Sequence, residues 1–433
     1  MAYDALVRIC ERKRGCRKRE AAARRTLAAC PGLQFGVAQS LVFGVLVLSC
    51  KDPAAAVPAE AEAKPVVTVS SASPTQTPTP THTAVEVAPV VFGDGGIAGC
   101  ATVVSATRLK RPGPYALAPV GGSIAAYVRE DDKPSLLATV DRGVKDESEG
   151  GSKPSSPPCV AAGARAFCAD AQGLVRLYEL GPAPRKVESV TLHARPGAAL
   201  AAAPVGSHSV VAYLRDHVTS EGVRMAAYLA DETGAEQPLS DDGAGATSVA
   251  LTGAVAVYID ARRGMSPVHA RALGAGPKVA VGPDVVVFVG GSAEAATRVY
   301  AASSGKTTWA LLPIAHDIGF GLAVIALGAD PQMDAPVAWS DYPNGLDPAP
   351  VAAATTDDGT AYVARVRPSS PTYNSPRVLE LGRIDAAGAF VAMGLVPTQG
   401  SPRDVALAAA GKDVVLAWDD GAGGAIERLH CVP

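Results

Sequence analysis

The sequence predicts an all-β protein whose main domain is a β-propeller of about seven blades. Three observations predict this fold: glycine and proline are frequent, at 44 and 35 of 433 residues, no stretch after residue 50 has the apolar stripe of an amphipathic helix, and one strand motif recurs. Frequent glycine and proline favour short strands joined by turns. With 48% hydrophobic residues, the chain has enough apolar surface to bury a core.

The recurring motif is a short apolar run, then an aromatic residue, then an acid that ends the strand. Tyr213 and Tyr258 lie 45 residues apart, whereas Tyr127 and Tyr213 lie 86 apart, which is about two units. A period of about 40–45 residues with several strands per unit is typical of a propeller, and residues 100–431 then hold about seven blades. Six or eight blades, or a large β-sandwich, are the alternatives. The motif occurs at Ile124–Glu130, Val210–Asp216, Val255–Asp260, Val337–Asp341 and Val414–Asp420, and more loosely at Ala164–Asp170 and Val285–Val289.

A further strand is expected after each motif, beyond a turn. Many of these turns place glycine beside an acid, as in Asp357-Asp358-Gly359, which is a hairpin signal. The expected following strands are Arg224–Ala230, Val268–Leu273 and Val351–Thr355. In these features the body resembles the secreted β-propellers of bacteria, of the TolB-like or sialidase-like repeat kind, over about three quarters of the chain. The Ser-x-Asp-x-Gly-x-x-Trp box of sialidases is absent.

Residues 1–49 are predicted to be an export signal. They carry nine Lys and Arg against three acids, and an apolar stretch over 35–49 precedes Cys50. This is the layout of a bacterial signal segment. Val47-Leu48-Ser49-Cys50 resembles the lipobox of bacterial lipoproteins, which implies that Cys50 is lipidated and becomes the mature N-terminus. The Arg24-Arg25 pair leaves both Sec and twin-arginine export open, and the long basic stretch leaves the start codon open.

Residues 50–92 are predicted to form the lipidated cysteine and a disordered tether. Residues 51–90 contain seven prolines and no aromatic residue, so they cannot bury enough apolar area to fold alone. An extended chain of that length reaches about 120 Å. The expected organisation is therefore signal (1–49), tether (50–92) and propeller (93–433), with the membrane as a partner through the lipid anchor. The alternatives are a cleaved signal peptide with a secreted protein, and an uncleaved anchor.

Four cysteines remain in the folded body, and their positions agree with export. A two-residue turn at Gly163-Ala164 would place Cys159 directly opposite Cys168, close enough for a disulfide. Cys100 begins the body and Cys431 nearly ends it, so a bridge between them would join the first and last strands of a ring. Buried free thiols are the alternative for each pair.

No catalytic, cofactor or metal site is predicted. Ser303-Ser304-Gly305-Lys306-Thr307 resembles half of a phosphate-binding loop, but Tyr300 replaces the first glycine, so a polar turn between strands is expected. Zinc-type and EF-hand spacings are absent. The histidines are scattered, so each is expected to be a buried or exposed side chain without partners, and none is expected to act as a base. They are His193, His208, His217, His269 and His316.

The expected function is that of an envelope-anchored binding or scaffold module that holds a protein or a glycan. Residues 50–433 carry 30 basic and 39 acidic groups, which argues against nucleic acid as a partner. We expect a monomer. The alternative is an extracytoplasmic propeller enzyme of the glycosidase, lyase or quinoprotein type, because groups from several blades can meet in a central channel.

Overall fold

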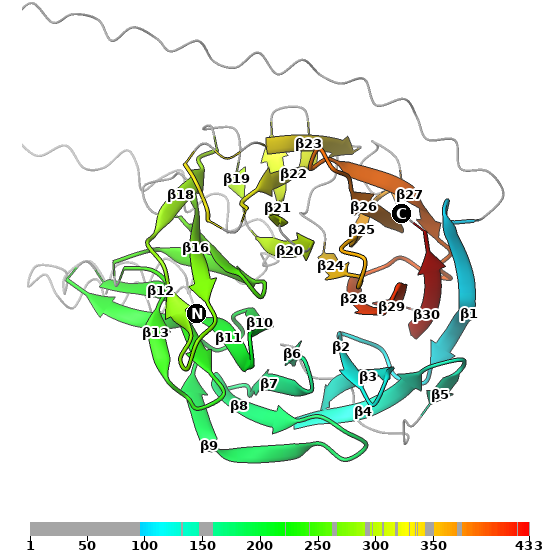
Figure 1. Cartoon of the computed structure of the whole chain (residues 1–433), viewed down its shortest axis with the longest axis horizontal. Coiled ribbons are helices and arrows are strands. Elements are labelled where there is room, and N and C mark those ends of the chain that lie inside the picture. Colours follow the sequence, from blue (N-terminus) through cyan, green and yellow to red (C-terminus); the bar gives the residue numbers. More distant parts are fainter. Residues whose placement is uncertain are drawn as a thin grey trace, which may run out of the picture. The chain divides into compact units, whose positions relative to one another are not determined.

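The computed structural model describes residues 96–432, except 131–132, 147–158, 221, 242, 262–265, 291–294, 297, 305–306, 317–318, 329, 334, 336, 343–349, 370–374 and 422. Over these residues the regular structure is entirely β, in seven small antiparallel sheets arranged as a ring (Figure 1). The all-β propeller prediction is confirmed, and so is the number of blades. Within the described part, no helix is long and apolar enough to cross a membrane. The predicted signal and tether lie outside the described residues and stay predictions.

Blades I to III follow one another along the chain. Each is a four-stranded meander that runs from the centre of the ring to its edge. Blade I contains β2 (Tyr115–Val120), β3 (Ser123–Glu130), β4 (Lys133–Val140) and β5 (Val144–Asp146). Blade II contains β6 (Val160–Ala162), β7 (Arg165–Ala169), β8 (Leu174–Glu179) and β9 (Arg185–His193). Blade III contains β10 (Leu200–Val205), β11 (His208–Thr219), β12 (Gly222–Asp231) and β13 (Glu236–Pro238).

Blades IV and V each carry one strand more, and blade VI is again a four-stranded meander. Blade IV contains β14 (Ala246–Leu251), β15 (Val255–Asp260), β16 (Val268–Gly274), β17 (Ala280–Val281) and β18 (Val285–Phe288). Blade V contains β19 (Ala295–Ala296), β20 (Tyr300–Ser304), β21 (Thr307–His316), β22 (Gly319–Ala326) and β23 (Val337–Tyr342). Blade VI contains β24 (Val351–Thr355), β25 (Ala361–Pro368), β26 (Arg377–Ile384) and β27 (Phe390–Val396).

Blade VII closes the ring, because it combines the two ends of the folded body. Its strands β28 (Asp404–Ala410), β29 (Asp413–Asp419) and β30 (Gly424–Cys431) come from the C-terminal end. Its outermost strand, β1 (Cys100–Leu109), comes from the N-terminal end and pairs antiparallel with β30. Cys100 is directly opposite Cys431 in this pairing, and the two form a disulfide. The predicted bridge between the first and last strands is confirmed.

The hydrophobic core is divided among the seven interfaces between neighbouring blades. Each of the seven apolar clusters of the described residues takes its members from two adjacent sheets. One of these clusters, which contains Ile124 and Val415, joins blade VII to blade I. The second strand of each blade is the most buried. Tyr127, Tyr213, Tyr258 and Trp418 of the recurring motif all lie on such strands and are at most 2% exposed. The motif therefore marks the strand that packs on both faces.

Two of the seven motif runs are strands, as expected, but they occupy other places in their blades than the remaining five. Val337–Asp341 lies on β23, the last strand of blade V in the order, and Trp309 on β21 lies in the second strand. Val351–Thr355 is accordingly β24, the first strand of the next blade. Val285–Val289 overlaps β18, an additional strand that pairs with β16. The apolar run and the aromatic residue indicate that a strand is buried, but they do not indicate how far it lies from the axis of the ring. The motif therefore does not distinguish these strands.

The Cys159–Cys168 hairpin has the predicted register. Ala162 pairs with Arg165 and Val160 with Phe167, around a turn at Gly163 with φ 61°. A positive φ at this position is the reason that glycine suits the turn. The two cysteines are disulfide-bonded and buried in the interface between blades I and II. Two disulfides in one body are typical of a protein that folds outside the cytosol.

Candidate functional site

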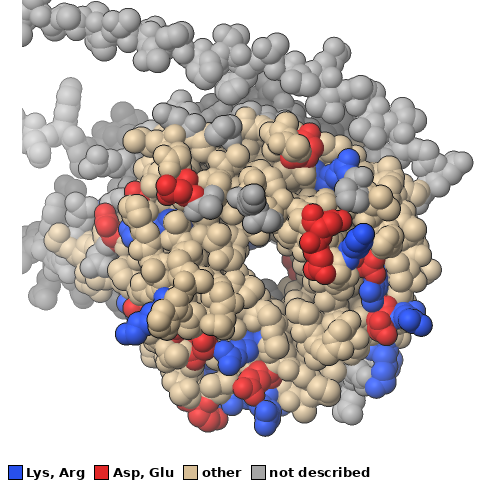
Figure 2. Space-filling model, in the orientation of Figure 1, with Lys and Arg blue, Asp and Glu red and all other residues tan. Residues whose placement is uncertain are grey.

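The wall of the central channel is formed by the innermost strands, β2, β6, β10, β14, β20, β24 and β28. Alanine is their commonest residue, and Asp404 is the only described residue on them with a charged side chain. The space-filling view shows an opening at the centre of the ring, and most residues around it on this face are uncharged (Figure 2). Small side chains on the inner strands leave this opening, because they do not reach the axis.

Asp404 begins β28, beside the end of β29. Burial, together with the nearby Asp419 carboxylate, raises the pKa of Asp404 to about 6. General acid–base chemistry needs a second group placed across the substrate. Among the described residues, the other inner strands place no acid, base or histidine opposite Asp404.

A groove of about 550 Å³, with both polar and apolar lining residues, lies where blades V and VI meet. Three turns border it: the β20–β21 hairpin, the β24–β25 turn and the β26–β27 turn. Ligand pockets of proteins commonly have volumes of about 300–1,000 Å³. The groove therefore has the size of a small-molecule site, and groups of several chemical kinds line it.

The groove contains hydrogen-bond donors that the described residues leave unused. The Arg383 guanidinium is half-buried and forms no hydrogen bond or ion pair with a described residue. The indole N–H of Trp309 likewise has no partner in the described part of the chain, and it borders Gly388, where an added Cβ would lie 3.4 Å from the indole Nε1. The other described arginines that are partly buried have partners, as in Arg428 with Asp413 at 2.7 Å. Unpaired donors in a concave surface are available to a ligand.

The same groove offers acceptors. Asp358 accepts hydrogen bonds through Oδ1 from the Thr356 hydroxyl at 2.7 Å and from the Thr360 amide at 3.1 Å. The Thr356 hydrogen bond, followed by that of the Thr360 amide, lowers the pKa of Asp358, so this carboxylate is ionised at neutral pH. Asp385 accepts through Oδ1 from two backbone amides of its own turn, at 2.8 and 2.9 Å. Each carboxylate is thus held in place through one oxygen.

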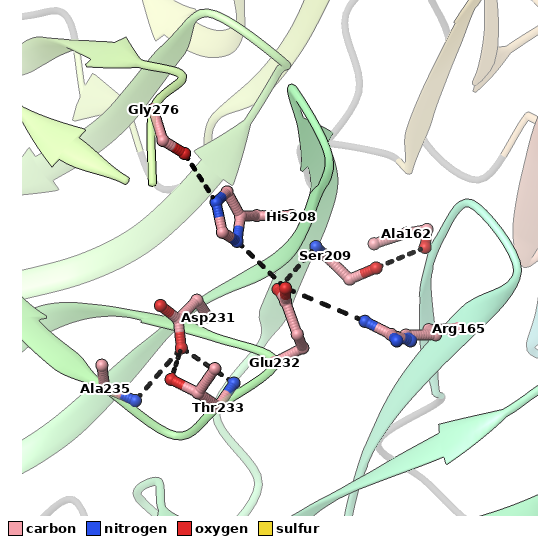
Figure 3. Close-up of polar contacts among 9 residues, drawn as sticks. All are labelled: Ala162, Arg165, His208, Ser209, Asp231, Glu232, Thr233, Ala235 and Gly276. Atoms are coloured by element: carbon pink, nitrogen blue, oxygen red, sulfur yellow. Dashed lines mark hydrogen bonds and ion pairs between the residues drawn. The ribbon is translucent and has the colours of Figure 1, made fainter. Parts of the chain in front are cut away.

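A second polar cluster connects three blades around His208 (Figure 3). The His208 Nδ1 lies 3.0 Å from Glu232 Oε1, and its Nε2 lies 2.9 Å from the carbonyl oxygen of Gly276. The other Glu232 oxygen accepts the Ser209 amide at 2.9 Å, and Arg165 approaches Glu232 at 4.0 Å. Because both imidazole nitrogens face acceptors, only the doubly protonated ring donates to both. The cluster joins blades II, III and IV.

We expect His208 to make the stability of the propeller depend on pH. The Gly276 carbonyl, followed by the Glu232 carboxylate, raises the pKa of His208. A raised pKa in the folded state gives stability that is fully present below about pH 6.5, the ordinary pKa of histidine, and is lost as pH rises through the folded-state pKa. The unfolding temperature of wild type relative to His208→Gln should therefore fall as pH increases in this window. His193→Gln is the control, and equal pH profiles for wild type and His208→Gln would contradict the expectation.

The other residues singled out in the sequence are placed as follows. His269 Nδ1 lies 2.9 Å from Asp284 Oδ2, which also accepts from the Tyr258 hydroxyl. The expectation of partnerless histidines is therefore wrong for His208 and His269, since long-range strand pairing supplies the carboxylates. In the described part of the chain, no group of three His, Cys, Asp or Glu side chains is arranged to hold a metal. Cys50 lies outside the described residues.

The phosphate-loop-like segment connects two paired strands, as expected, because Ser304 of β20 pairs with Thr307 of β21, whereas Gly305 and Lys306 lie outside the described residues. Ser304 and Thr307 line the groove, as does the Asp358-Gly359 turn. The sequence predicts both turns, but it does not predict that they lie at the same groove. Residues more than 50 positions apart give no local signal of contact, and Arg383 belongs to no motif.

Comparisons with known proteins assign no family. No family model and no curated protein matches the chain. Solved structures with some similarity include Chaetomium thermophilum Raptor, at 11% identity and a TM-score of 0.46, where the match covers 78% of this chain and 29% of that one. Others are the SapL1 lectin in complex with alpha methyl fucoside (12%, 0.42, covering 74% and 93%) and U3-55K (11%, 0.44, covering 76% and 98%).

Proposed function

We propose that this chain is a lipid-anchored, extracytoplasmic propeller that binds a ligand, protein or glycan, in the groove between blades V and VI. The proposal rests on two donors, Arg383 and Trp309, that have no hydrogen-bond partner among the described residues and lie in a groove that also holds oriented carboxylates. The disulfides support the compartment, because thiols stay reduced in the cytosol of most bacteria.

The binding function is tested by thermal unfolding of the full-length chain. A ligand that binds only the folded state stabilises it by RT ln(1 + [L]/Kd), and therefore raises the unfolding temperature. Fractions of the bacterial envelope, separated into soluble proteins, peptidoglycan and other polysaccharides, are added in turn. We expect at least one fraction to raise the unfolding temperature. Absence of a shift with every fraction would contradict the proposal.

The anchor is tested separately, at Cys50. We expect mass spectrometry of the mature protein to find an N-terminal, acylated Cys50, and Cys50→Ala to move the chain from the membrane fraction to the soluble fraction or to block its maturation. Cys30→Ala is the matched control, because that cysteine lies in the segment that is removed. A mature chain that still begins at Met1 would overturn the export assignment.

A further inference from the structure

The described charged side chains that line the groove between blades V and VI form no ion pairs with one another. Arg383, Asp358 and Asp385 all line it, yet no ion pair forms between the arginine and either carboxylate. Elsewhere the propeller pairs its partly buried arginines, for example Arg365 with Glu380 at 2.7 Å. Opposite charges that share a concave surface without pairing leave their hydrogen-bonding capacity to solvent or to a ligand.

The groove is lined by both carboxylates and a guanidinium group, and this combination limits the chemical class of ligand that can bind there. An anionic ligand would meet two carboxylates, and a cationic ligand would meet the Arg383 guanidinium, so the described lining residues favour neither charge. A neutral ligand with several hydroxyl groups suits it better, because each hydroxyl both donates and accepts. Such a ligand can donate to Asp358 and Asp385 while it accepts from Arg383 and the indole N–H of Trp309.

The border of the groove adds groups of the same kind. Ser304 and Thr307 line it from the β20–β21 hairpin, and their side chains have no hydrogen-bond partner among the described residues. Apolar surface is also present, from the Trp309 ring edge and from Ala326. A sugar ring presents hydroxyl groups around its rim and C–H groups on its faces, which matches this alternation of polar and apolar lining.

We infer that this groove is a binding site for a neutral saccharide unit. The inference rests on the proposed binding function and names its ligand class. Arg383 is assigned as the main donor, Asp358 and Asp385 as the acceptors held by their own turns, and the Trp309 N–H as a second donor. The volume of about 550 Å³ suits one or two sugar rings.

The test measures saccharide binding by the purified full-length chain. An array carries neutral monosaccharides and disaccharides together with sulfated and carboxylated sugars. We expect selective binding of neutral members, and Arg383→Gln should weaken it about 10-fold or more, because a hydrogen bond from a charged donor is lost. Trp309→Phe keeps an aromatic ring, although a smaller one, and removes the indole N–H, so a smaller loss is expected. Arg185→Gln is the matched control, since Arg185 is 81% exposed on blade II, and its affinity should equal that of wild type.

The remaining outcomes of this experiment would each support or overturn the saccharide site. Binding of no sugar, or selective binding of anionic sugars, would overturn it, and so would equal affinity of wild type and Arg383→Gln. If Arg383→Gln unfolds at a lower temperature than wild type, Ser304→Ala and Thr307→Val replace it: weakened binding supports the site and unchanged binding overturns it. An envelope fraction that stabilises wild type and Arg383→Gln equally would overturn the groove while leaving the binding function intact.

Discussion

Removal of the Cys100–Cys431 disulfide, as Cys100→Ala with Cys431→Ala, is expected to cost about 5 kcal/mol of unfolding free energy, in the chain-entropy model. The two cysteines are separated by 331 residues, so the crosslink restricts nearly the whole unfolded body. It also holds β1 against β30, the only strand pair of the described ring that joins the two ends of the chain. Denaturant unfolding followed by tryptophan fluorescence measures the loss, and Trp418 reports on the same blade.

The second disulfide is the matched control. Cys159 and Cys168 are separated by 9 residues, and closing such a short loop contributes about 2–3 kcal/mol in the same model. Cys159→Ala with Cys168→Ala should therefore cost about half as much. If the two double variants unfold at the same denaturant concentration, ring closure by the long crosslink does not contribute as expected.

Glu380→Ala is expected to cost about 3–5 kcal/mol, because it leaves two buried guanidinium groups without their shared partner. Glu380 Oε2 accepts from Arg365 Nε at 2.7 Å, and its Oε1 accepts from Arg367 Nε at 3.0 Å. The Glu380 side chain is 3% exposed, and those of Arg365 and Arg367 are 6% and 12% exposed. Water therefore cannot replace the carboxylate without rearrangement of blade VI.

The control for Glu380 is an exposed ion pair of similar geometry. Glu188 contacts Lys186 at 2.7 Å, with its side chain 79% exposed. Glu188→Ala should cost less than about 1 kcal/mol, because solvent screens the pair and hydrates the remaining lysine. Urea unfolding of both variants measures the difference. A cost for Glu380→Ala as small as that of Glu188→Ala would show that blade VI relaxes to solvate both arginines.

The fold could be predicted from the sequence because each blade of a propeller repeats the same local strand pattern. The run that ends in Tyr127, Tyr213, Tyr258 or Trp418 recurs since each blade needs a strand buried on both faces. The Cys159–Cys168 register followed from two-residue turn geometry alone. The spacing between the starts of successive innermost strands shows that the later blades are longer than the predicted period. These strands start at Tyr115, Val160, Leu200, Ala246, Tyr300, Val351 and Asp404.

The groove could not be predicted, for a physical reason. Ser304 ends β20, Asp358 lies in the β24–β25 turn and Arg383 lies on β26, and each residue is ordinary at its own position. What makes the site is that these three segments meet at one interface and that Arg383 has no hydrogen-bond or ion-pair partner there among the described residues. Neither property is encoded in a local pattern. Likewise, Glu232 comes within reach of His208 only because β11 and β12 are paired in register.

The position of Cys100 determines how a pulling force would enter the ring. Cys100 is the first residue of β1, so any tension along the preceding chain arrives at the disulfide before it reaches the hydrogen bonds of that strand. The covalent link transmits the load to Cys431 at the end of β30, a strand held between β1 and β29. The outermost strand is thereby protected from peeling away residue by residue. A propeller tethered to a membrane under shear would keep its circular shape for as long as that bond stays oxidised.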